Sequence, residues 1–199
     1  MALNRREFNK QETVRHIRST FMSLYAESGI DGITVSSLCK ACGIAKSTFY
    51  LYFDDKYQIL EAVEDNVLYQ LREVCNSFRA CDFRDRDLSR PLESAHATVR
   101  CLTENGDTIR ALMGKHGDPR FSYKWKKNIA EAFRDSFRAQ RGDNSSADIA
   151  CTIFSSSLIG LYTLFLFDNP NMTERDLSII LINLARFSLY DFEAFAEDI

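Results

Sequence analysis

Apolar residues recur at intervals of three and four along most of the chain. Such spacing places them on one face of a helix and indicates amphipathic helices rather than strands. We find no stretch with the convincing alternation that a strand would show. The stripes predict helices over residues 10–28, 56–80, 91–104, 107–116, 120–141, 147–167 and 173–192. The pattern therefore predicts an all-α protein.

A different pattern separates the first two stripes, where residues 34–53 read TVSSLCKACGIAKSTFYLYF. Thr34 is a suitable N-cap for a short helix. Gly43 is expected to end that helix, because glycine adopts the left-handed conformation at little cost. A second short helix follows and turns Phe49 and Phe53 inward. Two short helices joined in this way predict a helix-turn-helix, whose second helix normally enters the major groove of DNA.

The sequence from Gly43 to Lys56 reads GIAKSTFYLYFDDK. Together with Ser28-Gly29 and Gly32-Ile33-Thr34 before it, this run resembles the TetR family of bacterial transcription regulators over about residues 10–60. The resemblance implies an N-terminal three-helix DNA-binding domain at 1–55 and a helical regulatory and dimerisation domain at 56–199. It also implies a homodimeric repressor that binds a palindromic operator and responds to a ligand.

The helix-turn-helix supplies the candidate contacts to DNA. Lys46, Ser47 and Thr48 can bind phosphates or base edges, and Ala45 can offer a methyl group to thymine. The family resemblance implies further contacts from tyrosines and from residues at helix N-termini. Leu51 departs from the frequent polar residue of the family, which leaves a thymine-methyl contact or simple packing open. The full set is Thr34, Ala45, Lys46, Ser47, Thr48, Tyr50, Leu51, Tyr52 and Lys56.

Aromatic residues form a stripe along residues 120–141. Such a stripe usually belongs to a core, but the resemblance implies that the same helices enclose a pocket for a small apolar or aromatic effector. Both interpretations stay open. The pocket candidates are Phe78, Met113, Phe121, Trp125, Phe133, Phe137 and Phe154.

The last two predicted helices have more apolar surface than one domain face requires. An excess of this kind suggests a partner, and a twofold dimer that pairs both helices is the arrangement that the resemblance implies. Burial of both helices within one subunit is the alternative. The candidates for the dimer interface are Ile153, Ser157, Gly160, Leu161, Leu164, Leu181, Leu184 and Phe192.

Charge and composition agree with this picture. The net charge is −3. Residues 1–56 contain eight Lys/Arg and six Asp/Glu, which gives +2 and leaves −3 − 2 = −5 for the remainder. A basic N-terminal region on an acidic body suits a protein that contacts DNA with one end. We read residues 1–9 as a flexible arm in which Arg5 and Arg6 could reach DNA, or as a solvated terminus.

The N-terminal sequence lacks the apolar segment of a signal peptide, and no run of about 18 apolar residues suggests a membrane span. We therefore expect a cytoplasmic protein without a membrane partner. Its six cysteines are expected as free thiols.

Other candidate chemistry is weaker. Cys39-x-x-Cys42 lacks the second pair of ligands that a zinc site needs, so we expect two buried thiols and no metal or cofactor. His116 and Asp118 could bind a metal or a ligand, although turn formation explains them more simply. Their string GKHGDPRF resembles an element of regulators of dihydroxyacetone kinase operons.

The scattered histidines and the lack of a catalytic motif argue against an enzyme. An alternative function is that of a TetR-like co-regulator or activator that works through a partner protein.

Overall fold

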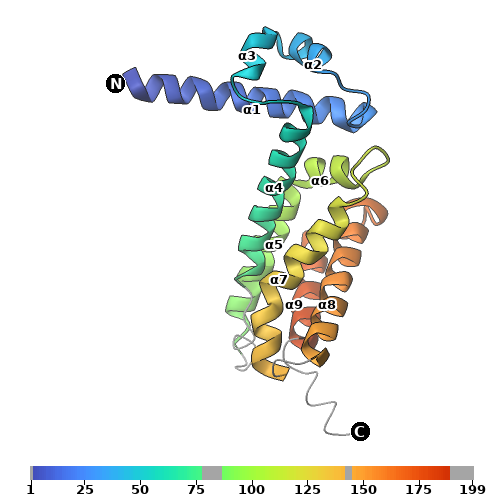
Figure 1. Cartoon of the computed structure of the whole chain (residues 1–199). Helices are drawn as coiled ribbons and strands as arrows, with labels where there is room; N and C mark the ends of the chain where they lie inside the picture. Colours follow the sequence, from blue (N-terminus) through green and yellow to red (C-terminus); the bar gives the residue numbers. More distant parts are fainter. Residues whose placement is uncertain (1, 78–86, 142–144, 189–199) are drawn as a thin grey trace, which may run out of the picture. The chain divides into compact units, whose positions relative to one another are not determined.

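The computed structural model describes residues 2–77, 87–141 and 145–188 of the 199-residue chain. Every regular element in these ranges is helical (Figure 1). The elements are α1 (Ala2–Ser28), α2 (Val35–Cys42), α3 (Lys46–Tyr50), α4 (Lys56–Cys75), α5 (Ser89–Glu104), α6 (Gly106–Met113), α7 (Phe121–Arg141), α8 (Ser145–Thr163), the π-helical turn η2 (Leu164–Asp168) and α9 (Glu174–Arg186). The predicted all-α fold class is confirmed.

The chain forms two compact units. The first contains Met1–Val67 together with Asp107–Phe121, and the second contains Leu68–Gly106 together with Ser122–Ile199. Helix α4 therefore contributes residues to both units. Packing places the division inside this helix, whereas the functional division predicted from the sequence lies between residues 55 and 56.

The first unit has a core at which α1, α2 and α3 meet. Ile17, Phe21, Leu38 and Phe49 are completely buried there. In Figure 1, α2 and α3 lie on the same side of α1. The expectation of a flexible arm at residues 1–9 is wrong from Ala2 onward, because α1 begins at that residue. The segment is rich in good helix formers and has no proline or glycine, so the helix can extend through it.

The second unit is a bundle built around aromatic contacts between α7 and α8. Trp125 stacks on Tyr162 with ring centroids 5.3 Å apart. Phe154 meets Phe133 edge to face at 4.9 Å and Phe137 at 5.6 Å. These aromatic pairs add specific geometry to the burial of apolar area, and they fix how the two helices pack.

Helix α8 continues into the π-helical turn, where the Asn169 N–H donates to the Leu164 carbonyl at 2.9 Å. The stretch Asp148–Asp168 is long and apolar enough to cross a membrane by length and composition alone. The sequence-based expectation overlooked it, because serines and a glycine interrupt the run while its average stays apolar. One such helix is weak evidence, since the core helix of a soluble protein has the same properties.

Candidate DNA-binding site

The N-terminus of α2 is fixed by a reciprocal cap. Thr34 is extended (φ −113°, ψ 154°), and its hydroxyl oxygen accepts the Ser37 N–H at 3.0 Å. The Ser37 hydroxyl oxygen accepts the Thr34 N–H at 3.0 Å. The predicted N-cap is confirmed, and the exposed hydroxyl of Thr34 lies at the start of the helix. Helix N-termini with unpaired N–H groups favour phosphates.

Gly43 makes the turn between α2 and α3. Its backbone is left-handed (φ 66°, ψ 29°), and its N–H donates to the Lys40 carbonyl at 3.2 Å. The following Ile44 N–H donates to the Cys39 carbonyl at 3.0 Å. Glycine adopts this conformation without the steric cost of a side chain, so the predicted end of the helix is confirmed. The turn sets the direction in which α3 leaves α2.

Helix α3 is anchored by a buried aromatic residue and presents its other side chains outward. Phe49 has no exposed surface and contacts the Tyr50 ring edge to face at 5.3 Å. The outward side of the candidate set consists of Ala45, Lys46, Ser47, Tyr50 and Leu51, all exposed, while Thr48 and Tyr52 are half-buried.

The exposed fraction of Leu51 is 77%, and that of Tyr50 is 55%. Packing against the described part of its own subunit therefore does not explain why a leucine occupies position 51.

Lys56 differs from the other candidates. It is half-buried at the first position of α4, and its ammonium donates to the carbonyls of Ile30 at 2.7 Å and Ile33 at 2.8 Å. The same ammonium lies 5.3 Å from the ring centroid of Tyr57. The structure thus engages this lysine with its own chain.

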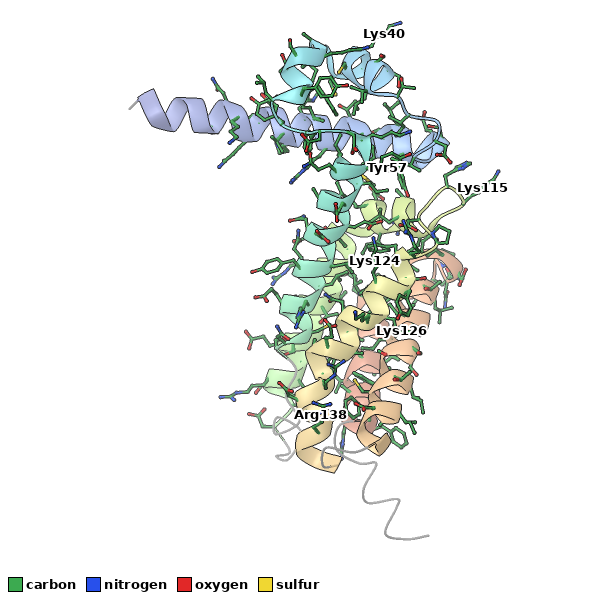
Figure 2. All side chains as sticks on the ribbon, viewed as in Figure 1. Lys40, Tyr57, Lys115, Lys124, Lys126 and Arg138 are labelled. Carbon is green, nitrogen blue, oxygen red and sulfur yellow. The ribbon has the colours of Figure 1, made fainter. Side chains whose placement is uncertain are left out.

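Two exposed residues of the first unit were not among the candidates. Lys40 lies in the last turn of α2 and points away from it in Figure 2, and Tyr57 lies in the first turn of α4. Helical-wheel projections of α2 and α4 would have identified Lys40 and Tyr57 as exposed side chains, because both fall outside the buried stripes.

The candidates for an effector pocket do not lie together in one place. Trp125, Phe133, Phe137 and Phe154 are buried in the second unit. Phe121 is buried and Met113 half-buried in the first unit, and Phe78 lies outside the described residues.

An open groove of about 560 Å³ runs along α5 and α9, and most of its lining residues are polar or charged in type, among them His96, Arg100, Glu174 and Arg175. None of the pocket candidates lines it.

The candidates for the dimer interface divide by exposure. Ile153, Ser157, Gly160 and Leu164 are exposed on one side of α8 and the turn that follows. Leu161 and Leu184 are half-buried, Leu181 is buried, and Phe192 lies outside the described residues. Further apolar side chains that the prediction missed are also exposed on α8, the π-helical turn, α9 or the residue after it: Ile149, Phe167, Ile179, Ile180 and Phe187.

The other candidate groups have local explanations. Cys39 and Cys42 are buried free thiols, and burial raises the pKa of Cys42. The Asp118 carboxylate accepts the Arg120 N–H at 2.8 Å and pairs with the Arg120 guanidinium at 3.2 Å, as a turn residue does. Among the described residues, no group of three or more His, Cys, Asp and Glu could hold a metal ion.

Comparison with known families identifies the first unit. Residues 17–63 match the family model described as bacterial regulatory proteins, tetR family. The match begins inside α1, includes the whole of α2 and α3, and ends inside α4. Residues 17–63 therefore form a domain of the tetR type. Its helix-turn-helix is thus a TetR-type DNA-binding motif.

Individual relatives agree. The class D tetracycline repressor of Escherichia coli is 30% identical over a match that covers 45% of this chain and 53% of the repressor. The matches to the first curated relatives span between 24% and 53% of those proteins' length. These relatives give no support to the resemblance with regulators of dihydroxyacetone kinase operons.

Solved structures show the fold over nearly the whole chain. A TetR transcriptional regulator from Streptococcus agalactiae 2603V has a TM-score of 0.64 and 21% identity, covering 93% of this chain and 99% of that one. AibR, solved in complex with isovaleryl coenzyme A and operator DNA, has a TM-score of 0.51 and 18% identity, covering 86% of this chain and 97% of its own.

Proposed function

We propose that the protein is a homodimeric repressor that binds a palindromic operator and releases it when a small molecule binds. The outward side of α3 is the observation that supports DNA binding best. Phe49 is buried and anchors the helix, while Lys46, Ser47 and Tyr50 are exposed. Such side chains can bind phosphates and base edges in the major groove.

The exposed apolar surface of α8 and α9 supports a dimer. Ile149, Ile153 and Leu164 recur along one side of α8 and its π-helical extension, at 60%, 62% and 41% exposure. Contiguous apolar surface of this kind marks an interface, and a second copy is the partner that twofold symmetry provides. Pairing would place two recognition helices about 34–36 Å apart, or a multiple of that, so that they meet both halves of a palindrome.

The aromatic residues of α7 and α8 support a small apolar or aromatic effector. They are already packed against one another, so an effector would have to separate them and would bind a conformation different from this one. A ligand changes DNA affinity only through different affinities for two conformations. AibR, a protein of the same fold, was solved with both an acyl coenzyme A and operator DNA. Acting on the chromosome, the regulator would work in the cytoplasm.

Leu51 favours a second candidate, a co-regulator or activator that works through a partner protein. An exposed leucine can bind an apolar protein surface as well as a thymine methyl group. Tight binding to another regulator, together with weak and unselective DNA binding, would support this function.

The test is selection of duplexes from a random pool, with wild-type protein and Tyr50→Ala in parallel at several salt concentrations. We expect a palindrome to be enriched by the wild type, bound less tightly as salt rises, and lost in the variant. If a folded wild-type dimer enriches no sequence, sequence-specific repression is wrong and the co-regulator becomes the better proposal.

A further inference from the structure

Lys56 joins the start of α4 to the loop between α1 and α2. Its ammonium donates to the carbonyl oxygens of Ile30 and Ile33 at 2.7 and 2.8 Å. These two residues open and close a turn, since the Ile33 N–H donates to the Ile30 carbonyl at 3.3 Å. One side chain therefore binds both ends of the turn. The two bonded residues precede Lys56 by 26 and 23 positions.

The surroundings of the Lys56 ammonium favour a bound cation. Helix α1 ends at Ser28, and Gly29 closes it in the left-handed conformation, with its N–H bonded to the Tyr25 carbonyl at 2.9 Å. The C-terminal end of a helix has a partial negative charge that favours cations. An ammonium with three donors can bond two carbonyl oxygens, and such bonds to a charged donor are stronger than neutral ones.

Lys56 is itself held in position by the first turn of α4. The Asp55 carboxylate accepts the Gln58 N–H at 2.9 Å, and the Gln58 side-chain oxygen accepts the Asp54 N–H at 2.8 Å. The backbone that presents the lysine is therefore fixed at both sides of the residue.

The turn that Lys56 holds leads directly into the capped N-terminus of α2. Ile33 is buried with 1% of its surface exposed, and Thr34 follows it as the N-cap. A shift of the turn would move Thr34 and the first N–H groups of α2 together. These are the groups that we expect to contact an operator phosphate.

We propose that Lys56 is a positioning residue that clamps the 30–33 turn and so orients the N-terminus of α2 toward the operator, without neutralising a phosphate itself. This role rests on the proposed DNA-binding function. It differs from the role predicted from the sequence, in which Lys56 contacts DNA directly.

The first experiment compares Lys56→Met with wild type on the selected operator as salt is varied. Methionine keeps a long apolar stem and loses every donor. The clamp predicts binding weakened about 10- to 100-fold, the scale of one or two lost hydrogen bonds to a charged group. It also predicts an unchanged salt slope, because no phosphate contact of a cation is removed. A slope lower by about 1 would instead mean that Lys56 contacts a phosphate.

Two further variants separate the roles. Thr34→Ala combined with Lys56→Met should weaken binding by much less than the product of the single effects, since both act on the same end of α2. Independent, multiplying effects would contradict the clamp. Lys56→Arg keeps the charge but replaces a compact ammonium with a planar fork. It should weaken binding as methionine does, and full affinity with arginine would overturn the proposal.

Hydrogen exchange in the free protein tests the clamp without DNA. The amides of Ile33, Thr34 and Ser37 should exchange about tenfold faster or more in Lys56→Met, because the turn and the cap open more often. Lys126→Met is the matched control, since Lys126 also lies over a tyrosine ring, at 5.9 Å from Tyr123, and loses the same charge. Unchanged exchange at these amides would contradict the clamp.

The two proposals can fail separately. A wild-type protein that enriches no duplex contradicts the proposed function, and exchange then decides the clamp alone. A wild type that binds its operator, with normal exchange and a reduced salt slope in Lys56→Met, contradicts the clamp alone.

Discussion

Both compact units expose large apolar side chains, but they arrange them differently. In the first unit, Tyr50, Leu51 and Tyr57 lie on or near the short helix α3, interspersed with polar and charged residues. In the second unit, Tyr69, Leu88, Leu92 and Tyr123 are exposed elsewhere, while most exposed apolar residues lie on α8, the π-helical turn, α9 and the residue that follows it: Ile149, Ile153, Leu164, Phe167, Ile179, Ile180 and Phe187.

The difference indicates which partner each surface suits. Separate apolar groups among lysine, serine and tyrosine can stay in water and meet a thymine methyl group or a sugar when DNA arrives. A continuous apolar stripe lowers its free energy only when a matching apolar surface covers it. The exposure of apolar side chains alone does not distinguish a DNA-binding surface from a protein interface. The spacing of these side chains does.

The largest expected effect is on the core of the second unit. Phe154→Ala removes a ring that contacts both Phe133 and Phe137. We expect the free energy of unfolding to fall by about 3–5 kcal/mol, as for other buried phenylalanines, measured by denaturant unfolding. Tyr69→Ala, at an exposed position of the same unit, should change it little. A loss well below 1 kcal/mol would instead favour a preformed pocket wall.

The second-largest expected effect is on dimerisation through the exposed apolar side chains of α8. Ile153→Glu places a charge where we propose that two copies meet, and an unpaired buried charge is costly. We expect the dissociation constant of the dimer to rise about 100-fold or more, measured by sedimentation. Tyr123→Glu is the control, because its side chain is equally exposed (63% against 62%) on a different helix of the same unit. A dimer unaffected by glutamate at 153 would place the interface elsewhere.

The third prediction concerns the pH dependence of stability in the first unit. Burial, with Glu64 and Asp118 nearby, raises the pKa of Tyr25 to about 12. The unfolded chain ionises this phenol near its ordinary value of about 10. The unfolded state therefore binds fewer protons between these values, and stability falls as pH rises from about 10 to about 12. Tyr25→Phe should lose stability less steeply across this window in thermal unfolding. Parallel profiles would show that Tyr25 does not titrate as described.

The smallest expected effect concerns Leu51. If its side chain meets a thymine methyl group, replacing that thymine by deoxyuridine should weaken binding severalfold, since one buried methyl contributes about 0.8 kcal/mol. Leu51→Ala should remove most of the difference between the two operators. A deoxyuridine scan that finds no sensitive position would favour a protein partner for this leucine.

Local features of the site could be predicted because the chemistry lies within a few residues. Thr34 and Ser37 bond each other across one helical turn, as do Thr173 and Asp176 at the start of α9. Gly43 ends α2 because of its own backbone freedom. In each case the residue type and its spacing indicate the structure directly.

Contacts between distant residues could not be predicted in the same way. The partners of Lys56 are carbonyl oxygens, which every residue has, so no side-chain type identifies them. The aromatic stripe of α7 is compatible with a core or a pocket, and its contact with Phe154 on another helix could not be predicted from spacing within α7. The start of α1 at Ala2 was missed because the segment has no apolar stripe, although its helix formers and its lack of proline and glycine permit a helix.

The first unit is assembled from two separate stretches of chain, Met1–Val67 and Asp107–Phe121. The polypeptide therefore crosses between the units three times, after residues 67, 106 and 121. A chimera that joins residues 1–55 of this protein to a foreign body would interrupt a compact unit and leave out its second stretch. Exchange of DNA-binding specificity, in the laboratory or by recombination, is thus simplest through replacement of the few exposed side chains of α3.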